Sequence, residues 1–419
     1  MGPRSTWYPR YVLALLTGIV TLSFIDRQLI VAASPLIKSE FSISDTQLGL
    51  LKGVAFALSY GLLVLPVARL ADKYSRTGVI SISLGIWSLV TALSGFASSF
   101  TQLLLLRFGL GVGEAGCSPP AHSMLSTLFA AEKRPLVLSI YSLGMPLGNM
   151  LAFLVGGLLI SQSGWRAAFV IFGIIGLVLL IVFRLTVREP RQAHTPHSTQ
   201  ALGIPSLPVS VMILFHSRDY RRLCLGAGFA VFSTFGLLAW ILDLFVRTHS
   251  QSLEEVSIRF ALIYGLGGAL GMLASAAVIT ILMDKHQHAN LIVPGIALLI
   301  SAPLAASALW IPDPTAAYIC LALSIMFIHC YFGPTYALAQ TLAPPELRSQ
   351  ASAIVVLVQV FIGAGLGPLI VGSISDVLNP LIGAGDALRV AVSVLPVSLL
   401  IAGFMFLGIA RIRVEEEKS

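Results

Sequence analysis

Four ionisable residues lie deep inside long apolar runs of this chain: Asp26, Arg27, Arg107 and Glu114. Charged side chains at membrane depth are costly and usually face a partner or a water-filled cavity. Arg107 and Glu114 are separated by nearly two helical turns, so they share one face of a helix. A rise of ~1.5 Å per residue across a core ~30 Å thick brings Asp26 and Arg107 to a similar depth. If their two runs are neighbours, the residues form a cluster of two carboxylates and two guanidinium groups.

The chemistry open to such a cluster is proton binding and anion binding. A carboxylate can take up and release a proton, whereas arginine stays charged. Our hypothesis is that Asp26 and Glu114 carry a coupling proton. Arg27 and Arg107 would then either hold the carboxylates in place or bind an anionic head group bidentately. The alternative is a structural set of ion pairs that locks the two runs together.

The composition explains why these charges stand out. The chain is 56% hydrophobic and 11% charged, with a mean hydropathy of +0.90, whereas soluble domains carry about 25% charged residues. Apolar runs close to the ~20 residues that cross a bilayer recur along the whole length. We predict an all-α polytopic membrane protein with twelve spans. They cover residues 11–33, 46–70, 78–98, 101–128, 135–161, 165–187, 221–246, 258–282, 289–311, 315–341, 349–375 and 386–410.

The basic residues predict the orientation of these spans. If the spans cross the membrane in turn, most of the 26 Lys and Arg residues fall on the same side of the membrane as the N-terminus. Cytoplasmic loops collect such residues. We therefore expect both termini to be cytoplasmic and the protein to reside in the cell (inner) membrane. The net charge of +7 reflects this topology and gives no support to nucleic-acid binding. The first span is longer than the apolar core of a signal peptide.

The cysteines and histidines predict no metal site. Cys117, Cys224, Cys320 and Cys330 all fall inside spans without ligand spacing, as expected of small buried apolar residues. We expect no cofactor, no metal and a monomer.

The longest polar segment divides the chain after six spans. We predict a six-helix bundle over residues 1–187, a cytoplasmic linker over 188–220 with a short helix near 209–215, and a second bundle over 221–419. Pro, Ser and Thr in the segment favour a linker.

The two halves repeat three short patterns at nearly constant separation. Asp72-Lys73 is matched by Asp284-Lys285, Glu132-x-Arg134 by Glu346-x-Arg348, and the glycines of 144–148 by those of 363–367. A duplicated unit with a central site is the architecture of alternating-access carriers.

Several motifs resemble one family of carriers. "ARLADKYSRT" at 68–77, "RFGLGVGEA" at 107–115 and "GWRAAF" at 164–169 resemble signatures of the major facilitator superfamily, although Ala68 and Ser75 replace two of its glycines. More narrowly, "FIDRQLI", "RFGLGVGEAGCSPPA" and "YSLGMPLGNMLAFLVGG" resemble the Spinster family. The resemblance implies that the first and fourth spans are neighbours. It also implies export of lysophospholipids and sphingolipid derivatives.

The same resemblance suggests a cytoplasmic gate. Asp72 and Arg76 would latch the two halves on the inner face in the outward-open state, with an exposed surface ion pair as the alternative. Weaker candidates for cavity lining are polar or amphipathic groups at membrane depth, which need partners when buried. They are Tyr60, Tyr141, Asn149, Trp240, His329 and Tyr331. Each could equally be a packing residue with its hydrogen bonds satisfied.

We therefore predict a proton-coupled secondary transporter of a lipid-like amphiphile, with protons and membrane lipids as its partners. A symporter of small organic anions would use the same arginines in a more polar cavity. A lipid-modifying membrane enzyme is the alternative from another class. The sequence holds no HExxH, GxSxG or GxxxxGK[ST] motif, so we do not expect an enzyme.

Overall fold

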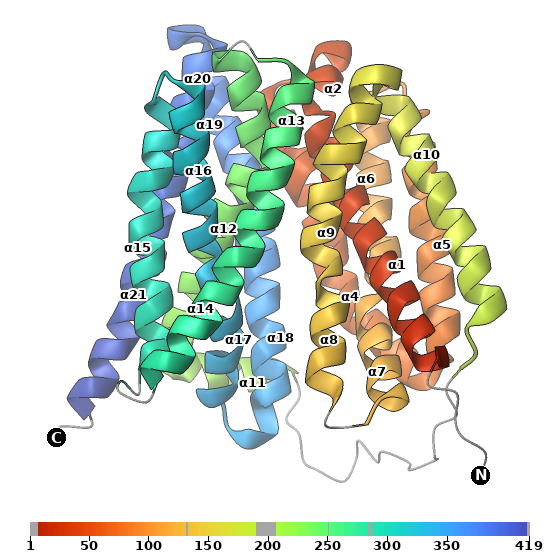
Figure 1. Cartoon of the computed structure of the whole chain (residues 1–419), viewed down its shortest axis with the longest axis vertical. Helices are drawn as coiled ribbons and strands as arrows, with labels where there is room; N and C mark the ends of the chain where they lie inside the picture. The colour runs from red at the N-terminus through yellow and green to blue at the C-terminus, as the bar shows by residue number, and fades with distance from the viewer. Residues whose placement is uncertain are drawn as a thin grey trace. The chain divides into compact units, whose positions relative to one another are not determined.

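The computed structural model describes residues 7–130, 133–189, 207–249, 251–283, 286 and 288–416. Every regular element within these ranges is helical, and Figure 1 shows the helices of each unit running side by side. The elements up to the predicted linker are α1 (Trp7–Ala32), α2 (Ser34–Phe41), α3 (Asp45–Gly49), η1 (Leu50–Val54), α4 (Ala55–Lys73), α5 (Arg76–Ser94), α6 (Phe100–Glu114), α7 (Ser118–Leu128), α8 (Arg134–Ser142), α9 (Gly144–Leu151), η3 (Ala152–Gly156) and α10 (Gly157–Thr186).

The elements after the linker begin with a short helix, α11, which confirms the helix expected near 209–215. They are α11 (Leu207–His216), α12 (Arg218–Thr248), α13 (Leu253–Leu262), η4 (Ile263–Gly267), α14 (Gly268–Met283), α15 (Ala289–Trp310), α16 (Pro314–Ile328), η5 (His329–Tyr331), α17 (Phe332–Thr341), η6 (Pro345–Leu347), α18 (Arg348–Val358), η7 (Gln359–Gly365), α19 (Leu366–Ile382), α20 (Ala384–Val392) and α21 (Val394–Glu416).

The helices form two compact units. Unit 1 comprises Met1–Ile43, Leu50–His197 and Leu253–Ala261, and unit 2 comprises Ser44–Gly49, Ser198–Ser252 and Leu262–Ser419. Each unit thus includes one short segment from the other half of the sequence. The domain limits at 187 and 221 stay a prediction, and residues 190–206 of the expected linker lie outside the described residues.

The helices account for the twelve expected spans. Ten described segments are long and apolar enough to cross a membrane. One of them, Leu136–Thr186, is a pair of spans, because Gly164 takes φ 81° and ψ 161° and turns the chain. Only glycine adopts such a conformation without strain. The twelfth span is α6 with α7, which the break at 115–117 divides into two pieces too short to qualify singly.

The break between α6 and α7 has a cause in the sequence. Pro119 and Pro120 are the second and third residues of α7, where proline is tolerated because the N–H groups of a helix's first turn have no acceptor within the helix. The same prolines cannot continue α6, since their rings would clash with the preceding turn. The fourth span is therefore fully interrupted, and the interruption falls directly after Glu114.

Four short π-helical segments repeat between the two halves. They are η1 and η3 in the second and fifth spans, and η4 and η7 in the eighth and eleventh. A π-helical turn inserts one residue into a helix and often marks a functional site. The matching positions agree with a duplicated six-helix unit.

Candidate functional site

Two helices of unit 1, α1 and α6, bring together the deep charges of the sequence. Nε of Arg27 donates a hydrogen bond of 2.6 Å to Oε2 of Glu114, the last residue of α6. The hydroxyl of Ser23, one turn before Arg27, donates to the same oxygen at 2.8 Å. The Arg27 and Glu114 side chains are 18% and 1% exposed. The first and fourth spans are therefore joined by a buried ion pair.

Aromatic rings surround the guanidinium group of Arg27. Its central carbon lies 4.6 Å from the ring centroid of Phe24, 4.5 Å from that of Phe56 and 5.0 Å from that of Tyr60. The faces of such rings attract cations, and more strongly where water is excluded. The rings offset part of the cost of a buried charge on Arg27, and among the described residues its ionic partner is Glu114.

Arg107 has a different role from Arg27. Its Nη1 and Nη2 donate to the backbone carbonyls of Asp26 at 3.1 Å and of Arg27 at 3.0 Å, and its Nε donates to that of Leu51 at 3.3 Å. It is 2% exposed. All three contacts are with main-chain oxygens, so Arg107 fixes α1 against η1 and the two acidic side chains are left to other partners.

Asp26 lies in the same region with its carboxylate buried. The residue is 1% exposed, and neither of its carboxylate oxygens has a hydrogen-bond partner among the described residues. Trp87 and Thr91, which are polar groups of α5, are neighbours. An ionised carboxylate is costly in such surroundings, so a proton that binds Asp26 removes most of that cost.

Glycines of α6 let this region pack closely. A Cβ at Gly113 would lie 2.7 Å from Cβ of Trp87, and a Cβ at Gly111 would clash with Ser59 of α4. Real Cβ atoms do not approach other atoms so closely. The glycines between Arg107 and Glu114 therefore hold α6 against α4 and α5, and they fix the depth of both charged groups.

The predicted cytoplasmic gate is described only in part. The side chain of Asp72 lies outside the described residues. Arg76 is buried and donates from Nε to Oε1 of Glu189 at 3.0 Å, and from Nη1 to the hydroxyls of Ser123 and Thr127 at 3.0 Å each. Arg76 thereby ties α5 to α7 and to the chain beyond α10, and its role as a gate stays a prediction.

Glu189 is a partner that sequence reasoning missed. Its Oε2 also accepts hydrogen bonds from the Thr77 N–H at 2.9 Å and from the Ser75 hydroxyl at 2.8 Å. Partial burial raises the pKa of Glu189, but the hydrogen bonds from Thr77, Ser75 and Arg76 outweigh this and hold its pKa below the usual value. No local pattern could reveal the contact between Arg76 and Glu189, because these residues are 113 positions apart.

The cavity-lining candidates of unit 1 are buried polar groups. Tyr141 is 4% exposed, and its hydroxyl has no hydrogen-bond partner among the described residues. The same holds for Oδ1 of Asn149, a residue that is 8% exposed. Tyr60 packs against Phe56 with ring centroids 5.3 Å apart, beside Arg27.

The candidates of unit 2 divide into two kinds. Nε1 of Trp240 donates to the carbonyl of Pro368 at 2.9 Å, and the residue is fully buried. His329 lies 2.8 Å from the carbonyl of Ile325 through Nδ1. Tyr331 is fully buried, with a hydroxyl that has no hydrogen-bond partner in the described part of the chain. Tyr331 is therefore the stronger candidate for a polar contact with a ligand, and its role stays a prediction.

Unit 2 also contains an ionic cluster that the sequence did not reveal. The guanidinium of Arg247 donates to both carboxylate oxygens of Asp45, at 2.8 and 2.9 Å. The hydroxyl of Ser375 donates to Asp45 at 2.7 Å, and the backbone N–H groups of Asp45 and Thr46 donate to the carboxylate of Asp376 at 2.8 and 2.7 Å. This cluster seats the segment 44–49 on α12 and α19.

No group of His, Cys, Asp or Glu within the described ranges could hold a metal ion.

The family of the chain follows from comparison with known proteins. The model of the Major Facilitator Superfamily matches residues 16–368. An MFS-type efflux pump of Mycolicibacterium smegmatis is 30% identical over 414 residues, which cover 98% of this chain and 94% of that protein. The chain therefore belongs to the major facilitator superfamily, as its motifs predicted.

Two further matches narrow this assignment. The crystal structure of a bacterial homolog to the human lysosomal transporter Spinster matches with a TM-score of 0.87 at 29% identity, covering 97% of this chain and 98% of that one. The sphingosine-1-phosphate transporter SPNS2 of Danio rerio is 25% identical over 411 residues, covering 93% and 81% of the two chains. Within the superfamily, the chain is a member of the Spinster family.

Proposed function

We propose that this chain is a proton-coupled secondary active transporter that works by alternating access and exports lysophospholipid or sphingolipid-derived amphiphiles. Its partners are then protons, an amphiphilic anion and the surrounding membrane lipids, and it acts as a monomer in the inner membrane. The lipid class rests on the Spinster membership and on the sphingosine-1-phosphate transporter among its relatives.

The observation that carries the proposal is the pairing at Glu114. This carboxylate is buried and accepts from Arg27 and Ser23, while its other oxygen, Oε1, has no hydrogen-bond partner among the described residues. A proton that binds Glu114 removes its charge and leaves Arg27 without its ionic partner. A buried cation without a partner is costly, so an anionic head group gains affinity for Arg27 at that moment. Proton binding and anion binding are thereby linked.

The two arginines have distinct tasks in this scheme. Arg107 donates to three backbone carbonyls, so it holds α1 in position. Arg27 contacts a carboxylate and aromatic rings, so it binds the head group. Asp26 is the second proton carrier, because its carboxylate is buried without a hydrogen-bond partner in the described residues. The Asp72–Arg76 gate belongs to the same proposal.

Transport by purified protein in liposomes tests the proposal. Lysophospholipids, sphingoid phosphates and small organic acids are offered across pH gradients of both polarities. We expect movement of the lipid-like anions that depends on the gradient, and loss of that dependence in Glu114→Gln and Asp26→Asn. Asp386→Asn is the matched control, since Asp386 is an exposed carboxylate paired with Arg389.

Each of the other outcomes has a definite meaning. Movement of small acids alone would mean that the substrate is a small organic anion, and it would favour the symporter of such anions. Chemical alteration of the lipid would indicate an enzyme. Unchanged pH dependence in both carboxyl variants would remove the coupling role from this site.

A further inference from the structure

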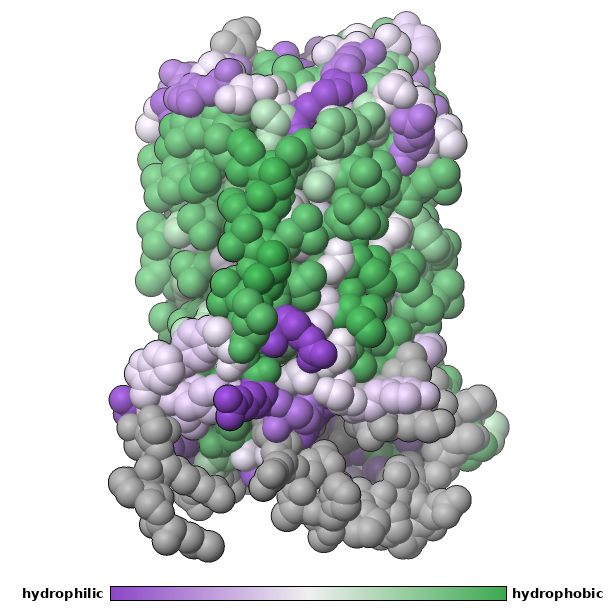
Figure 2. All heavy atoms as spheres, turned by 90° about the vertical axis from the view of Figure 1, so that its right-hand side faces the viewer, coloured by the Kyte–Doolittle hydropathy of each residue, from purple (hydrophilic) through white to green (hydrophobic). Residues whose placement is uncertain are grey.

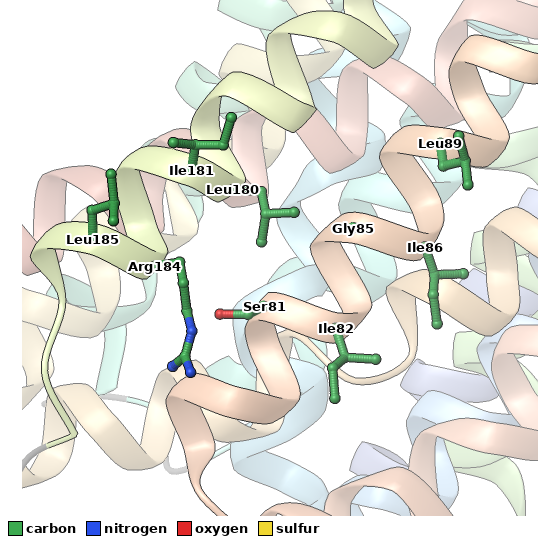
Figure 3. A pocket seen from close by; sticks show the side chains of 9 residues that line it. All are labelled: Ser81, Ile82, Gly85, Ile86, Leu89, Leu180, Ile181, Arg184 and Leu185. Atoms are coloured by element: carbon green, nitrogen blue, oxygen red, sulfur yellow. The ribbon is translucent and has the colours of Figure 1, made fainter.

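Unit 1 has a hollow on its surface, between α5 and α10. Its volume is about 630 Å³, and Figure 3 shows the side chains around it. The lining residues are Ser81, Ile82, Gly85, Ile86 and Leu89 of α5, and Leu180, Ile181, Arg184 and Leu185 of α10. None of them belongs to the charged cluster of α1 and α6, so the hollow is a separate feature.

The walls of the hollow are hydrophobic and open to the surroundings. Ile82 is 67% exposed, Leu89 50% and Ile181 57%. Its floor depends on Gly85, where a Cβ would lie 3.2 Å from the side chain of Leu180. From Ser81 to Leu89 the wall runs roughly 12 Å along α5, at ~1.5 Å per residue. That length takes up a substantial part of an extended acyl chain.

A single cation closes one end of the hollow. Arg184 lies in the last turn of α10, and it lines the hollow together with Ser81, as labelled in Figure 3. Arg184 is exposed and makes no hydrogen bond or ion pair with any residue that the structure describes. The Ser81 hydroxyl donates to the carbonyl of Thr77 at 2.7 Å, so it does not occupy the guanidinium.

The surroundings of Arg184 are hydrophobic. Its neighbours Ile181 and Leu185 are 57% and 78% exposed. Figure 2 shows the corresponding face of the molecule as a broad hydrophobic band with a small hydrophilic patch in its lower part. A cation at the edge of such a band attracts an anion from outside the chain, because no described side chain supplies one.

We propose that this hollow binds an anionic phospholipid of the cytoplasmic leaflet, with its phosphate on Arg184 and one acyl chain along Ile82, Ile86 and Leu89. The cytoplasmic side follows from the distribution of basic residues, which places the end of α10 there. That leaflet carries the anionic lipids, and one arginine at its surface attracts them roughly fivefold. The site holds a resident bilayer lipid, so it does not depend on the transported substrate or on proton coupling.

Native mass spectrometry of the full-length protein tests the occupant. The protein is released from micelles that contain equal amounts of phosphatidylglycerol and phosphatidylcholine. We expect wild type to retain phosphatidylglycerol roughly fivefold over phosphatidylcholine, Arg184→Gln to lose this preference and Arg184→Lys to keep most of it. Arg10→Gln is the matched control, because Arg10 is also exposed at the predicted inner side of unit 1. Equal retention of both lipids by wild type, or an undiminished preference in Arg184→Gln, would overturn the proposal.

A fluorescence measurement tests the position of the acyl chain. Tryptophan is placed in the hollow by Ile86→Trp, and outside it by Leu105→Trp, a residue of α6 that is 66% exposed. Brominated phosphatidylglycerol should quench the first more strongly than the second, and adding Arg184→Gln should remove only that excess. Equal quenching at both positions would show that no bilayer phospholipid occupies the hollow. An excess that appears with brominated lysophospholipid and not with brominated phosphatidylglycerol would show the same.

Discussion

Nε of Arg27 lies 2.6 Å from Oε2 of Glu114, so the first and fourth spans of unit 1 are joined through one buried carboxylate oxygen. Ser23 donates to the same oxygen, while Oε1 of Glu114 has no hydrogen-bond partner in the described residues. Breaking a buried ion pair on one side leaves an uncompensated charge. Because this contact is at once a structural link and a titratable site, its variants should separate stability from coupling.

Replacing Glu114 by Gln should destabilise the protein and abolish pH-dependent transport. The amide can still accept from Ser23, so we expect a loss of roughly 3 kcal/mol, the lower end of the range for a broken buried pair. The free energy of unfolding in mixed micelles measures the first effect, and liposome transport measures the second. A variant that keeps wild-type stability would show that Arg27 does not depend on the Glu114 charge.

Replacing Asp26 by Asn should have the opposite effect on stability. Neither oxygen of the Asp26 carboxylate has a hydrogen-bond partner within the described residues, and an amide of the same shape keeps Thr91 and Trp87 as neighbours while it ends the cost of a buried charge. We expect no loss of stability and a gain of up to about 1 kcal/mol, together with loss of pH-dependent transport. The same unfolding measurement on both variants provides the comparison. A destabilisation as large as that of Glu114→Gln would contradict the unpaired state of Asp26.

Replacing Arg107 by Lys should damage the fold despite the retained charge. A lysine ammonium cannot reproduce three donors in a planar group, and the carbonyls of Asp26, Arg27 and Leu51 would lose their shared partner. We expect a loss of roughly 3 kcal/mol, about one for each hydrogen bond. Arg27→Lys should keep most of the stability and lose head-group binding. Size-exclusion chromatography after heating measures the thermal stability of the two variants, which should be lower for Arg107→Lys than for Arg27→Lys.

The sequence predicted the helical fold well. The apolar runs and the linker helix both reflect local chemistry, which a sequence displays directly. The motifs of the second, fourth and sixth spans likewise identified the superfamily.

The pairing within the charged cluster was beyond sequence reasoning. Asp26 and Arg27 are adjacent, and adjacent helical residues point about 100° apart. Only one of them can face Glu114, and the choice depends on how α1 is rotated against α6. The sequence left open whether each arginine holds the carboxylates or binds a head group, and it gave no sign that Arg107 contacts backbone carbonyls. The contact of Asp45 with Arg247 was equally hidden, because these residues are 202 positions apart.

The Glu189 carboxyl predicts a pH dependence of stability. Its pKa is lowered in the folded state by hydrogen bonds that outweigh partial burial. A lowered folded pKa means that the stabilisation is complete above the usual glutamate pKa of about 4.3 and is lost as the pH falls through the lower folded value. Glu189→Gln should therefore unfold at a lower temperature than wild type at pH 7, and the gap should close in acid. Glu346→Gln, at an exposed position in unit 2, is the control. A gap that persists at low pH would assign the effect to packing.

The Asp45–Arg247 pair of unit 2 should show strong energetic coupling. Arg247 and Asp45 are 16% and 3% exposed and make two hydrogen bonds. Arg247→Gln leaves the Asp45 charge buried with fewer donors, so we expect a loss of roughly 3 kcal/mol. Asp45→Asn removes the other member of the pair. The double variant removes both charges and so leaves neither of them uncompensated. Its loss should therefore be smaller than the sum of the two single losses by more than about 1 kcal/mol. Arg389 and Asp386, an exposed pair in the same unit, should give a coupling below about 0.5 kcal/mol. Strictly additive losses at Asp45 and Arg247 would mean that Ser375 and the backbone, and not the ion pair, hold the segment 44–49 in place.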